Sequence, residues 1–355
     1  MSLTLKVNND MTSGQRQKNG AKISVIVPVY NEAMHIESVL DQLLAQEYPV
    51  ENYEILVVDG LSTDGTPDLI QKYVNKYGNI RLLMNPKRLS SSARNIGIKA
   101  AKGEIILIID GHCIIPHHRI LANVNETMKN PEIDALGRPQ PLLHENLTPV
   151  QNAIALARGS NLGHQPDSFV YSDKPQLVPA QSVAVAYRKT VFDRIGLFDG
   201  KFDACEDCEL NQRFDNAGLK CYFTPDIGVN YIPRDSFFRL WKQMTRYGKG
   251  RVRLQRKHPG SSSLKLIVPA LFVIGLVAGA VFSLLSKWIA FVYLGVLAFY
   301  IAMILAESCR LSIKNRFPFG ILLVPVALIA IHLAAGTGLI TETLFGKRIR
   351  SVHKK

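Results

Sequence analysis

The stretch ISVIVPVY, residues 23–30, decides the fold class of this chain. It is a continuous apolar run with several β-branched residues, and residues 36–46 follow with apolar side chains at helical spacing. The same order returns after YEILVVDG (53–60) and NIRLLMN (79–85), and EIILIIDG (104–111) is a fourth such run. Strands this apolar are buried on both faces, so the sequence predicts an α/β domain with a mostly parallel sheet and helices on each side.

Polar residues stand where three of these runs end: Asn31 and Glu32, then Asp59, then Asp110. Ligands of open α/β sheets bind beyond the carboxyl ends of the strands, so we expect these side chains to share one crevice. Each acid taken alone could equally be the N-cap of the next helix.

The charge of the chain is unevenly distributed. The formal net charge is +13, but residues 234–265 hold ten Lys and Arg against one acid, and residues 346–355 hold five against none. The basic excess therefore flanks the apolar segments and leaves the α/β region nearly balanced. This pattern fits anionic lipid headgroups and argues against a nucleic acid as partner.

The last third of the chain is apolar enough to enter a bilayer. Residues 266–286, 288–306 and 317–341 lack Asp, Glu, Lys and Arg, and each has about the 20 residues or more that span a membrane as a helix. Three crossings are expected from length, but they would put the basic tail opposite the N-terminal domain, against the positive-inside tendency. The alternative is two crossings with one re-entrant or interfacial segment, and the third segment, which contains Pro325, is the weakest helix.

A basic amphipathic stretch precedes these segments. Within residues 234–263, Phe237, Leu240, Trp241 and Met244 recur at helical spacing with Lys and Arg between them. This makeup is typical of a helix that lies in the plane of the membrane interface, although an ordinary docking helix has the same pattern.

The cysteines and the N-terminal residues indicate a cytoplasmic chain. The five cysteines are odd in number and lack the spacing of a disulfide framework. Cys205 and Cys208 form a Cys-x-x-Cys without a second pair, so redox or zinc chemistry is not expected there. Residues 1–21 are polar, have no apolar core of signal-peptide length and are expected to form a loose tail.

Six short motifs occur in a fixed order along the chain: VPVYNE, VVDGLSTDGT, ARNIG, IIDGH, CEDCELNQR and QMTRY. In this order they resemble glycosyltransferase family 2, the inverting enzymes with a GT-A fold, and within it the membrane-anchored exopolysaccharide transferases of the succinoglycan type. The resemblance covers residues 22–259 by motif and the hydrophobic tail by architecture only. It implies an enzyme that uses a nucleotide-sugar.

The resemblance implies that the donor nucleoside lies at Pro28, Tyr30, Glu32 and Asp59. A carboxylate at Asp59 would accept the imide N–H of uracil, which suits a UDP-sugar. The usual Asp-Asp-Gly-Ser of the family reads DGLS here, so only its first acid is carried over. Arg94 matches a family arginine near the donor, and a guanidinium suits a diphosphate.

The same resemblance implies a divalent metal ion at IIDGH. Asp110 is the natural ligand, and His112 stands where a second aspartate is usual. Imidazole suits Mn²⁺ better than Mg²⁺, so we favour ligation by His112 and Mn²⁺ as the ion. The alternative is that His112 only shapes the pocket and Asp110 holds the metal together with the donor diphosphate.

The family places its general base at the second acid of Glu-Asp, hence at Asp207, with Glu206 in support. A single base without an enzyme nucleophile means one displacement with inversion, so that an α-linked donor gives a β-linkage. Gln243, Arg246 and Tyr247 match Gln-x-x-Arg-Trp with Tyr in place of Trp. In relatives this segment closes over the donor diphosphate and the acceptor.

We therefore expect a transferase that adds one sugar to a polyprenyl-linked or other lipid-associated acceptor for cell-surface polysaccharide, at the cytoplasmic membrane. It would be multi-pass, with its catalytic domain on the cytoplasmic side, anionic lipids around it and possible partners among polysaccharide-assembly proteins. A processive synthase, or a catalytically silent nucleotide-sugar-binding scaffold, is the alternative. The expected divisions are a flexible tail (1–21), a GT-A catalytic domain (22–233), a basic interfacial segment (234–263), about three transmembrane helices (264–345) and a basic tail (346–355).

Overall fold

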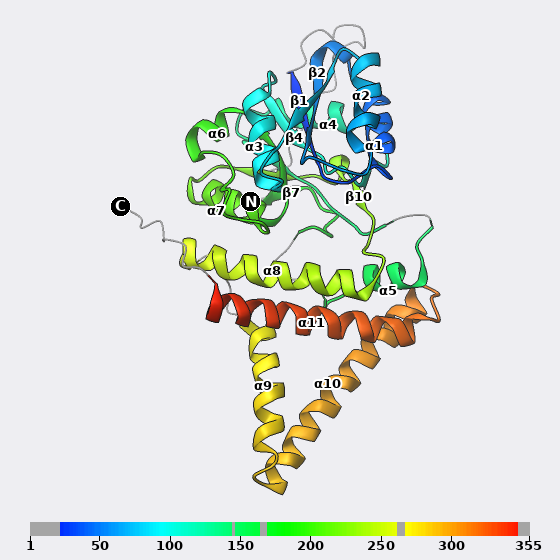
Figure 1. Ribbon diagram of the computed structural model, residues 1–355, viewed down its shortest axis with the longest axis vertical. Helices are drawn as coiled ribbons and strands as arrows, with labels where there is room; N and C mark the ends of the chain where they lie inside the picture. The colour runs from blue at the N-terminus through cyan, green and yellow to red at the C-terminus, as the bar shows by residue number, and fades with distance from the viewer. Residues whose placement is uncertain (1–21, 144–145, 164–168, 261–266, 347–355) are drawn as a thin grey trace.

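The computed structural model describes residues 22–143, 146–163, 169–260 and 267–346. The expected polar tail at residues 1–21 and all but the first residue of the basic tail lie outside the described residues. The described chain forms an α/β domain on one side of a group of long helices, as Figure 1 shows.

A central sheet organises the α/β domain. Its strands are β1 (Ile23–Val29), β2 (Tyr53–Asp59), β3 (Ile80–Met84), β4 (Ile105–Ile108), β6 (Ala135–Gly137), β7 (Gln176–Val178), β8 (Ala184–Arg188) and β9 (Cys221–Phe223). They lie in the order β3-β2-β1-β4-β8-β6-β9-β7, and β3, β2, β1 and β4 are parallel. The strand β8 runs antiparallel to β4 and β6, and β7 runs antiparallel to β9, whereas β6 and β9 are parallel. The prediction of a mostly parallel sheet is confirmed.

Helices cover both faces of this sheet. They are α1 (Ile36–Leu44), α2 (Thr66–Lys76), α3 (Ser90–Ala100), α4 (Ile120–Met128), α6 (Thr190–Ile195) and α7 (Glu206–Asn216), with 3₁₀ turns η1 (Val50–Asn52), η2 (Ala180–Ser182) and η3 (Pro225–Ile227). The helix α5 (Pro149–Arg158) packs instead against α11 (Gly320–Phe345) and α8 (Phe237–Lys257). Val25 and Val27 of β1 pack in one core with α1 and α4, whereas Ile26 packs in the other with α3 and α7, because successive strand residues point to opposite faces. A Cβ on Gly97 of α3 would lie 2.5 Å from Ile26, so this close packing requires glycine.

Two short strands bring a distant segment back to the sheet. The strands β5 (Cys113–Ile114) and β10 (Asn230–Tyr231) pair antiparallel, with Tyr231 opposite Cys113. This pairing carries Tyr231, far away in the sequence, to the end of β4, where Asp110 lies.

The C-terminal part consists of α8 (Phe237–Lys257), α9 (Val268–Phe282), α10 (Lys287–Lys314) and α11 (Gly320–Phe345). In the described chain α10 and α11 are long and apolar enough to cross a membrane, and α9 is a shorter apolar helix. The three expected apolar segments are therefore helical. Figure 1 shows α9 and α10 as a hairpin that projects away from the α/β domain, whereas α11 runs beside α8.

The helix α11 differs from α10 in its surroundings. In its most apolar stretch 44% of the residues are buried within the structure, against 6% for α10. Leu240 and Met244 of α8 share an apolar core with α5 and with Val324 and Leu328 of α11. The two helices approach closely, because a Cβ on Gly338 would lie 2.3 Å from the carbonyl oxygen of Thr245. The helix α11 is thus packed against protein, chiefly against α8 and α5, over much of its apolar stretch.

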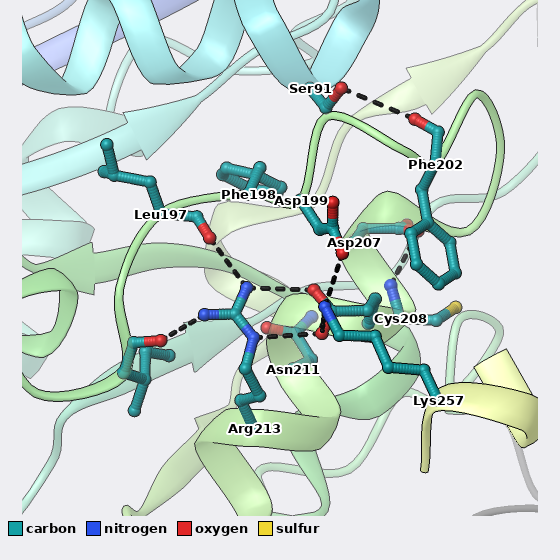
Figure 2. A network of polar contacts seen from close by, with 12 residues as sticks. Ser91, Leu197, Phe198, Asp199, Phe202, Asp207, Cys208, Asn211, Arg213 and Lys257 are labelled. Atoms are coloured by element: carbon teal, nitrogen blue, oxygen red, sulfur yellow. Dashed lines mark hydrogen bonds and ion pairs between the residues drawn. The ribbon is translucent and has the colours of Figure 1, made fainter. Parts of the chain in front are cut away.

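A buried carboxylate joins α7 to the end of α8. The Glu209 side chain is fully buried and accepts hydrogen bonds from Arg213 (Nη2, 2.9 Å), Lys257 (Nζ, 2.8 Å) and His258 (Nε2, 3.0 Å). Lys257 also reaches Asp199 at 2.5 Å, and Figure 2 shows Arg213 and Lys257 entering this cluster. These contacts fix α7, and with it the first turn at Glu206, against α8.

Replacing Glu209 tests this junction. Burial alone would raise the pKa of the Glu209 carboxyl, but hydrogen bonds from His258, Arg213 and Lys257 lower it to about 2 from an ordinary 4.5. Its stabilisation is therefore present above about pH 4.5 and lost as the pH falls towards 2, and amounts to about 3 kcal/mol. Glu209→Gln should lower the melting temperature of the detergent-solubilised chain at pH 7. Between about pH 2 and pH 4.5 the melting temperature of this variant should change less with pH than that of the wild type.

The matched control is Glu132→Gln, which removes an exposed carboxylate paired with Lys220. Exposed pairs contribute little, so this variant should melt like the wild type. Equal melting of the Glu209 and Glu132 variants at pH 7 would contradict the role given to Glu209.

Candidate active site

Asp59, at the end of β2, is fully buried. Its Oδ1 accepts a hydrogen bond from the hydroxyl of Ser62 (2.5 Å) and its Oδ2 accepts one from the Ser62 backbone N–H (3.0 Å). The Ser62 hydroxyl in turn accepts from the backbone N–H of Asn31 (2.8 Å), so Asp59 holds together the loops after β1 and β2. The alternative of a helix N-cap is wrong for Asp59, because Gly65 occupies that position of α2.

The departure from Asp-Asp-Gly-Ser has a local explanation. Leu61 takes the left-handed backbone conformation (φ 62°) that favours glycine, and glycine is the family residue at this place. A Cβ on Gly60 would lie 3.2 Å from the ring of Tyr30, so an acid at Gly60 would crowd that ring. Tyr30 is 47% exposed, and the Arg88 guanidinium lies 6.0 Å from its ring centroid. Pro28 lies inside the sheet, where it pairs with Val58, and is less exposed than Tyr30.

Arg94 of α3 joins two acids that are far apart in the sequence. Its Nη1 donates to Oε1 of Glu206 (3.0 Å), and its Nη2 lies 3.6 Å from Oδ1 of Asp110. The face of the guanidinium packs on Phe198, 5.3 Å from the ring centroid. The other oxygen of Asp110 accepts a hydrogen bond from the Tyr231 hydroxyl (2.7 Å). Asp110 is therefore oriented from both sides.

The electrostatics of these acids differ. Burial alone would raise the pKa of Asp110, but Arg94, His112 and the Tyr231 hydroxyl outweigh it and lower that pKa. Burial raises the pKa of Glu206, which Arg94 only partly offsets. Asp110 is thus the stable anion at the end of the sheet, and Glu206 is the buried partner of Arg94.

His112 lies two residues beyond Asp110 and is held by Glu32. Its Nδ1–H donates to Oε1 of Glu32 (2.9 Å), and its ring meets that of Tyr231 edge-on, with centroids 6.1 Å apart. Within the described residues Nε2 makes no hydrogen bond. Burial lowers the pKa of His112, but the hydrogen bond to Glu32 and the charge of Asp110 raise it overall.

Glu206 and Asp207 occupy the first turn of α7 and point in different directions. Glu206 is buried against Arg94, whereas Asp207 is exposed. Cys205, in the left-handed conformation (φ 59°), makes the sharp turn into the helix. The backbone N–H of Cys208 donates to Oδ1 of Asp207 (2.8 Å), and Figure 2 shows Asp207 near this end of α7. The pair of acids is therefore divided into one structural and one accessible carboxylate.

The three motif residues of α8 lie next to the same turn. Gln243 Nε2 donates to the Tyr247 hydroxyl (3.2 Å), and the Tyr247 carbonyl accepts from Sγ of Cys205 (3.9 Å). Arg246 Nη2 donates to the carbonyl oxygen of Asp203 (2.7 Å). Arg246 thus connects α8 to the loop before Asp207. The sequence predicted a role for Arg246 at the donor diphosphate and the acceptor, but it did not predict this contact.

Two residues of the site had no sequence signal. Tyr231 reaches Asp110 only through the pairing of β10 with β5. Arg138, directly after β6, is 1% exposed and donates from Nη2 to the carbonyl oxygen of Ile108 (3.2 Å) at the end of β4. Its Nε and Nη1 have no hydrogen-bond partner in the described chain. Its charge is one of those that lower the pKa of Asp110.

The described residues contain no group of three or more His, Cys, Asp or Glu that could hold a metal ion. A metal at this site would therefore rest on Asp110 and His112, with its other ligands from outside the described residues. The donor set fits such an ion, because Glu32 fixes Nδ1 of His112 and leaves Nε2 for coordination.

Comparisons with known proteins identify the family and the fold. The model of "Glycosyl transferase family 2" matches residues 24–194. A dolichyl N-acetyl-α-D-glucosaminyl phosphate 3-β-D-2,3-diacetamido-2,3-dideoxy-β-D-glucuronosyltransferase of Methanococcus voltae is 32% identical over 87% of this chain and 93% of its own length. The succinoglycan biosynthesis protein ExoA of Rhizobium meliloti is 28% identical over 92% and 96%.

Among solved structures, the mannosyltransferase PcManGT of Pyrobaculum calidifontis, in complex with GDP-Man and Mn²⁺, is similar to this chain in fold. The TM-score is 0.55 at 22% identity, over 93% of this chain and 89% of that one. The expected fold class is confirmed by this likeness together with the sheet and the apolar helices. The chain belongs to glycosyltransferase family 2, and it is a glycosyltransferase.

Proposed function

We propose that this glycosyltransferase moves a sugar from a nucleotide-sugar to a lipid-linked acceptor, with inversion at the anomeric carbon. The observation that carries the proposal is an exposed Asp207 next to Glu206, which is buried and is linked through Arg94 to Asp110. The name of the relative from Methanococcus voltae contains a dolichyl sugar phosphate and a β-linked transferred group, and that of the relative from Rhizobium meliloti contains succinoglycan biosynthesis.

In this proposal Asp207 is the general base. Its carboxylate takes the proton of an acceptor hydroxyl while that oxygen forms a bond to the anomeric carbon. The bond from this carbon to the donor diphosphate breaks on the opposite side, and the diphosphate leaves with the electron pair. Glu206 is committed to Arg94, so it holds the first turn of α7 in place and leaves the proton transfer to Asp207.

We propose a UDP-sugar as the donor, on the strength of the family motif around Asp59. The exposed Tyr30 offers an aromatic surface on which a base can stack. The Asp59 carboxylate already accepts two hydrogen bonds from Ser62, one on each oxygen, and has further acceptor sites for the imide N–H of uracil.

We propose that Asp110 and His112 hold a divalent ion, with Mn²⁺ favoured over Mg²⁺. Such an ion supplies a Lewis acid for the departing diphosphate. Glu32 behind His112 is the carboxylate that commonly orients a ligating imidazole. The similar structure from Pyrobaculum calidifontis was solved with Mn²⁺, which supports this assignment.

We propose that the chain crosses the cytoplasmic membrane twice, through α9 and α10, with the α/β domain on the cytoplasmic side. The exposed apolar surfaces of α10 suit lipid, whereas α11 is partly buried against α8 and α5. A bidentate ion pair also holds α11 to α8, since Arg253 donates to both oxygens of Glu342 at 2.9 Å and 3.1 Å. We therefore replace our expectation of three crossings by two, with α11 and the basic α8 in the interface.

The alternatives differ in what they require. A processive synthase would make long polymer and usually has more membrane helices than the two proposed here, which favours addition of a single sugar. A silent scaffold subunit would not need an accessible base, and Asp207 is exposed. Other polysaccharide-assembly proteins stay proposed partners.

Transfer of radiolabelled sugar to membrane lipid tests the function. When UDP-, GDP- and other nucleotide-sugars are compared as donors, a UDP-sugar should transfer one labelled sugar to a lipid. Asp207→Asn should lower kcat by roughly 10²–10⁴-fold with little change in donor binding, because the base is lost and the fold is kept. Asp68→Asn, an exposed acid in the first turn of α2, is the control and should stay active. Unchanged transfer by Asp207→Asn would show that Asp207 is not the general base. Formation of long polymer would favour a processive synthase.

Metal titration tests His112. The wild type should bind Mn²⁺ more tightly than Mg²⁺, and His112→Asp should shift this preference towards Mg²⁺. Glu32→Gln should weaken Mn²⁺ binding by roughly 10–100-fold. Because the pKa of His112 is raised above its ordinary 6.5, its proton competes with the metal, and Mn²⁺ affinity should rise with pH through that pKa. His118→Ala, an exposed histidine, is the control. Full Mn²⁺ affinity in His112→Ala would exclude ligation.

Epitope tags in sealed inverted vesicles test the topology. A tag after Lys355 and a tag before Met1 should both be accessible from the cytoplasmic face, whereas a tag between α9 and α10, at Leu285, should be protected. If the C-terminal tag is protected while the N-terminal tag is accessible, the chain crosses the membrane three times and the proposal of two crossings is wrong.

A further inference from the structure

Tyr231 belongs to a short strand whose main chain is held by two neighbouring segments. The strand β10 pairs antiparallel with β5, so that Tyr231 lies opposite Cys113. The Tyr231 backbone N–H donates to the carbonyl oxygen of Pro141 (2.8 Å), and Tyr231 forms a parallel β-bridge with Leu142. The backbone of Tyr231 is therefore fixed by main-chain contacts that do not depend on its hydroxyl.

The Tyr231 side chain contacts both residues that are proposed to hold the divalent ion. Its hydroxyl donates to Oδ2 of Asp110 (2.7 Å), and its ring meets that of His112 edge-on, with centroids 6.1 Å apart. Glu32 in turn binds Nδ1 of His112 (2.9 Å). Asp110 and His112 therefore each have a hydrogen-bond partner that can orient them, as the ligands of metal ions usually do.

The main chain that leads to Asp110 is fixed as well. The backbone N–H of Ile109 donates to the carbonyl oxygen of Ile26 (3.0 Å). The buried Arg138 donates from Nη2 to the carbonyl oxygen of Ile108 (3.2 Å). The freedom left to Asp110 is the rotation of its side chain, and a hydroxyl bound to one carboxylate oxygen restricts that rotation.

The two oxygens of Asp110 are not equivalent. Oδ2 accepts the short hydrogen bond from Tyr231, whereas Oδ1 lies 3.6 Å from Nη2 of Arg94, which is beyond hydrogen-bond distance. A carboxylate oxygen that accepts a hydrogen bond has one lone pair fewer for a cation. Oδ1 is therefore the oxygen of Asp110 that is better suited to ligate a metal ion.

We propose that Tyr231 is a positioning residue that holds Asp110 for ligation through one oxygen and so favours Mn²⁺ over Ca²⁺. The inference rests on the proposed function and deepens it by naming what sets the choice of ion at Asp110 and His112. Ca²⁺ readily takes bidentate carboxylates in a set of oxygen ligands, whereas an imidazole suits a transition ion. Without the Tyr231 hydroxyl, both oxygens of Asp110 become available to one cation.

Titration of the full chain in detergent with MnCl₂ and CaCl₂ tests this role without a need for turnover. Free Mn²⁺ is measured by electron paramagnetic resonance, and Ca²⁺ binding is measured by its competition with bound Mn²⁺. Tyr231→Phe should weaken Mn²⁺ binding by roughly 10–100-fold, because the partner that orients a ligand is lost. Ca²⁺ binding should weaken less, so the ratio of Mn²⁺ to Ca²⁺ affinity should fall. In the transfer assay, added Mn²⁺ should restore the activity of Tyr231→Phe but not that of Asp207→Asn.

The matched control is Tyr73→Phe, which removes a tyrosine hydroxyl that donates to Oδ1 of Asp41 over the same 2.7 Å, between α2 and α1. It should bind both ions like the wild type. An unchanged ratio of Mn²⁺ to Ca²⁺ affinity in Tyr231→Phe would overturn the positioning role. This holds even if the melting temperature of Tyr231→Phe fell, because the hydroxyl would then only support the fold.

The titrations and the transfer assay separate this inference from the proposed function. If the wild type binds Mn²⁺ and Tyr231→Phe binds both ions equally well, the metal site stands and the positioning role fails. If the wild type binds no Mn²⁺, the proposed metal site fails and the positioning role fails with it. If Tyr231→Phe loses Mn²⁺ but no nucleotide-sugar supports transfer by the wild type, the positioning role stands and the proposed transfer fails.

Discussion

The ionic bridge of Arg94 between Asp110 and Glu206 is the constraint on which the rest of the site depends. It connects the carboxyl end of β4 to the first turn of α7, across 112 positions of sequence between Arg94 and Glu206. A guanidinium that is largely removed from water is stable only when acids pair with it, so Arg94 fixes Asp110 and Glu206 relative to each other. With Glu206 turned inward, Asp207 is the carboxylate of this turn that solvent and substrate can reach.

A second set of contacts fixes this site relative to the apolar helices. Glu209 binds the end of α8 through Lys257 and His258, and Arg246 binds the loop before α7. The helix α8 is in turn packed along α11, with glycines where the two backbones meet. Because these contacts are continuous, the position of Asp207 relative to the proposed membrane surface is set by the fold. If the acceptor is carried by a lipid, as proposed, its sugar lies at a set distance from the membrane surface, and the base must lie at the same distance.

Several features of the site could be predicted from the sequence, and for a clear reason. Buried parallel strands require apolar runs, and polar residues directly after them must lie at one edge of the sheet, as Asp59 and Asp110 do. The grouping of Asp110 with His112 follows from their spacing alone. By contrast, Tyr231 and Arg138 reach Asp110 through strand pairings with no local pattern, so nothing in their neighbourhood marks them.

The sequence by itself determined the order of the first four strands, the family and the apolar character of three C-terminal segments, because periodicity and motif order are local properties. It could not decide how those segments are used. An apolar helix of sufficient length can lie in lipid or against protein, and only the tertiary structure packs α11 along α8 while α9 and α10 project away. In the same way, Glu206 and Asp207 are adjacent acids in the sequence. Their difference arises because Arg94, brought by another helix, pairs with only one of them.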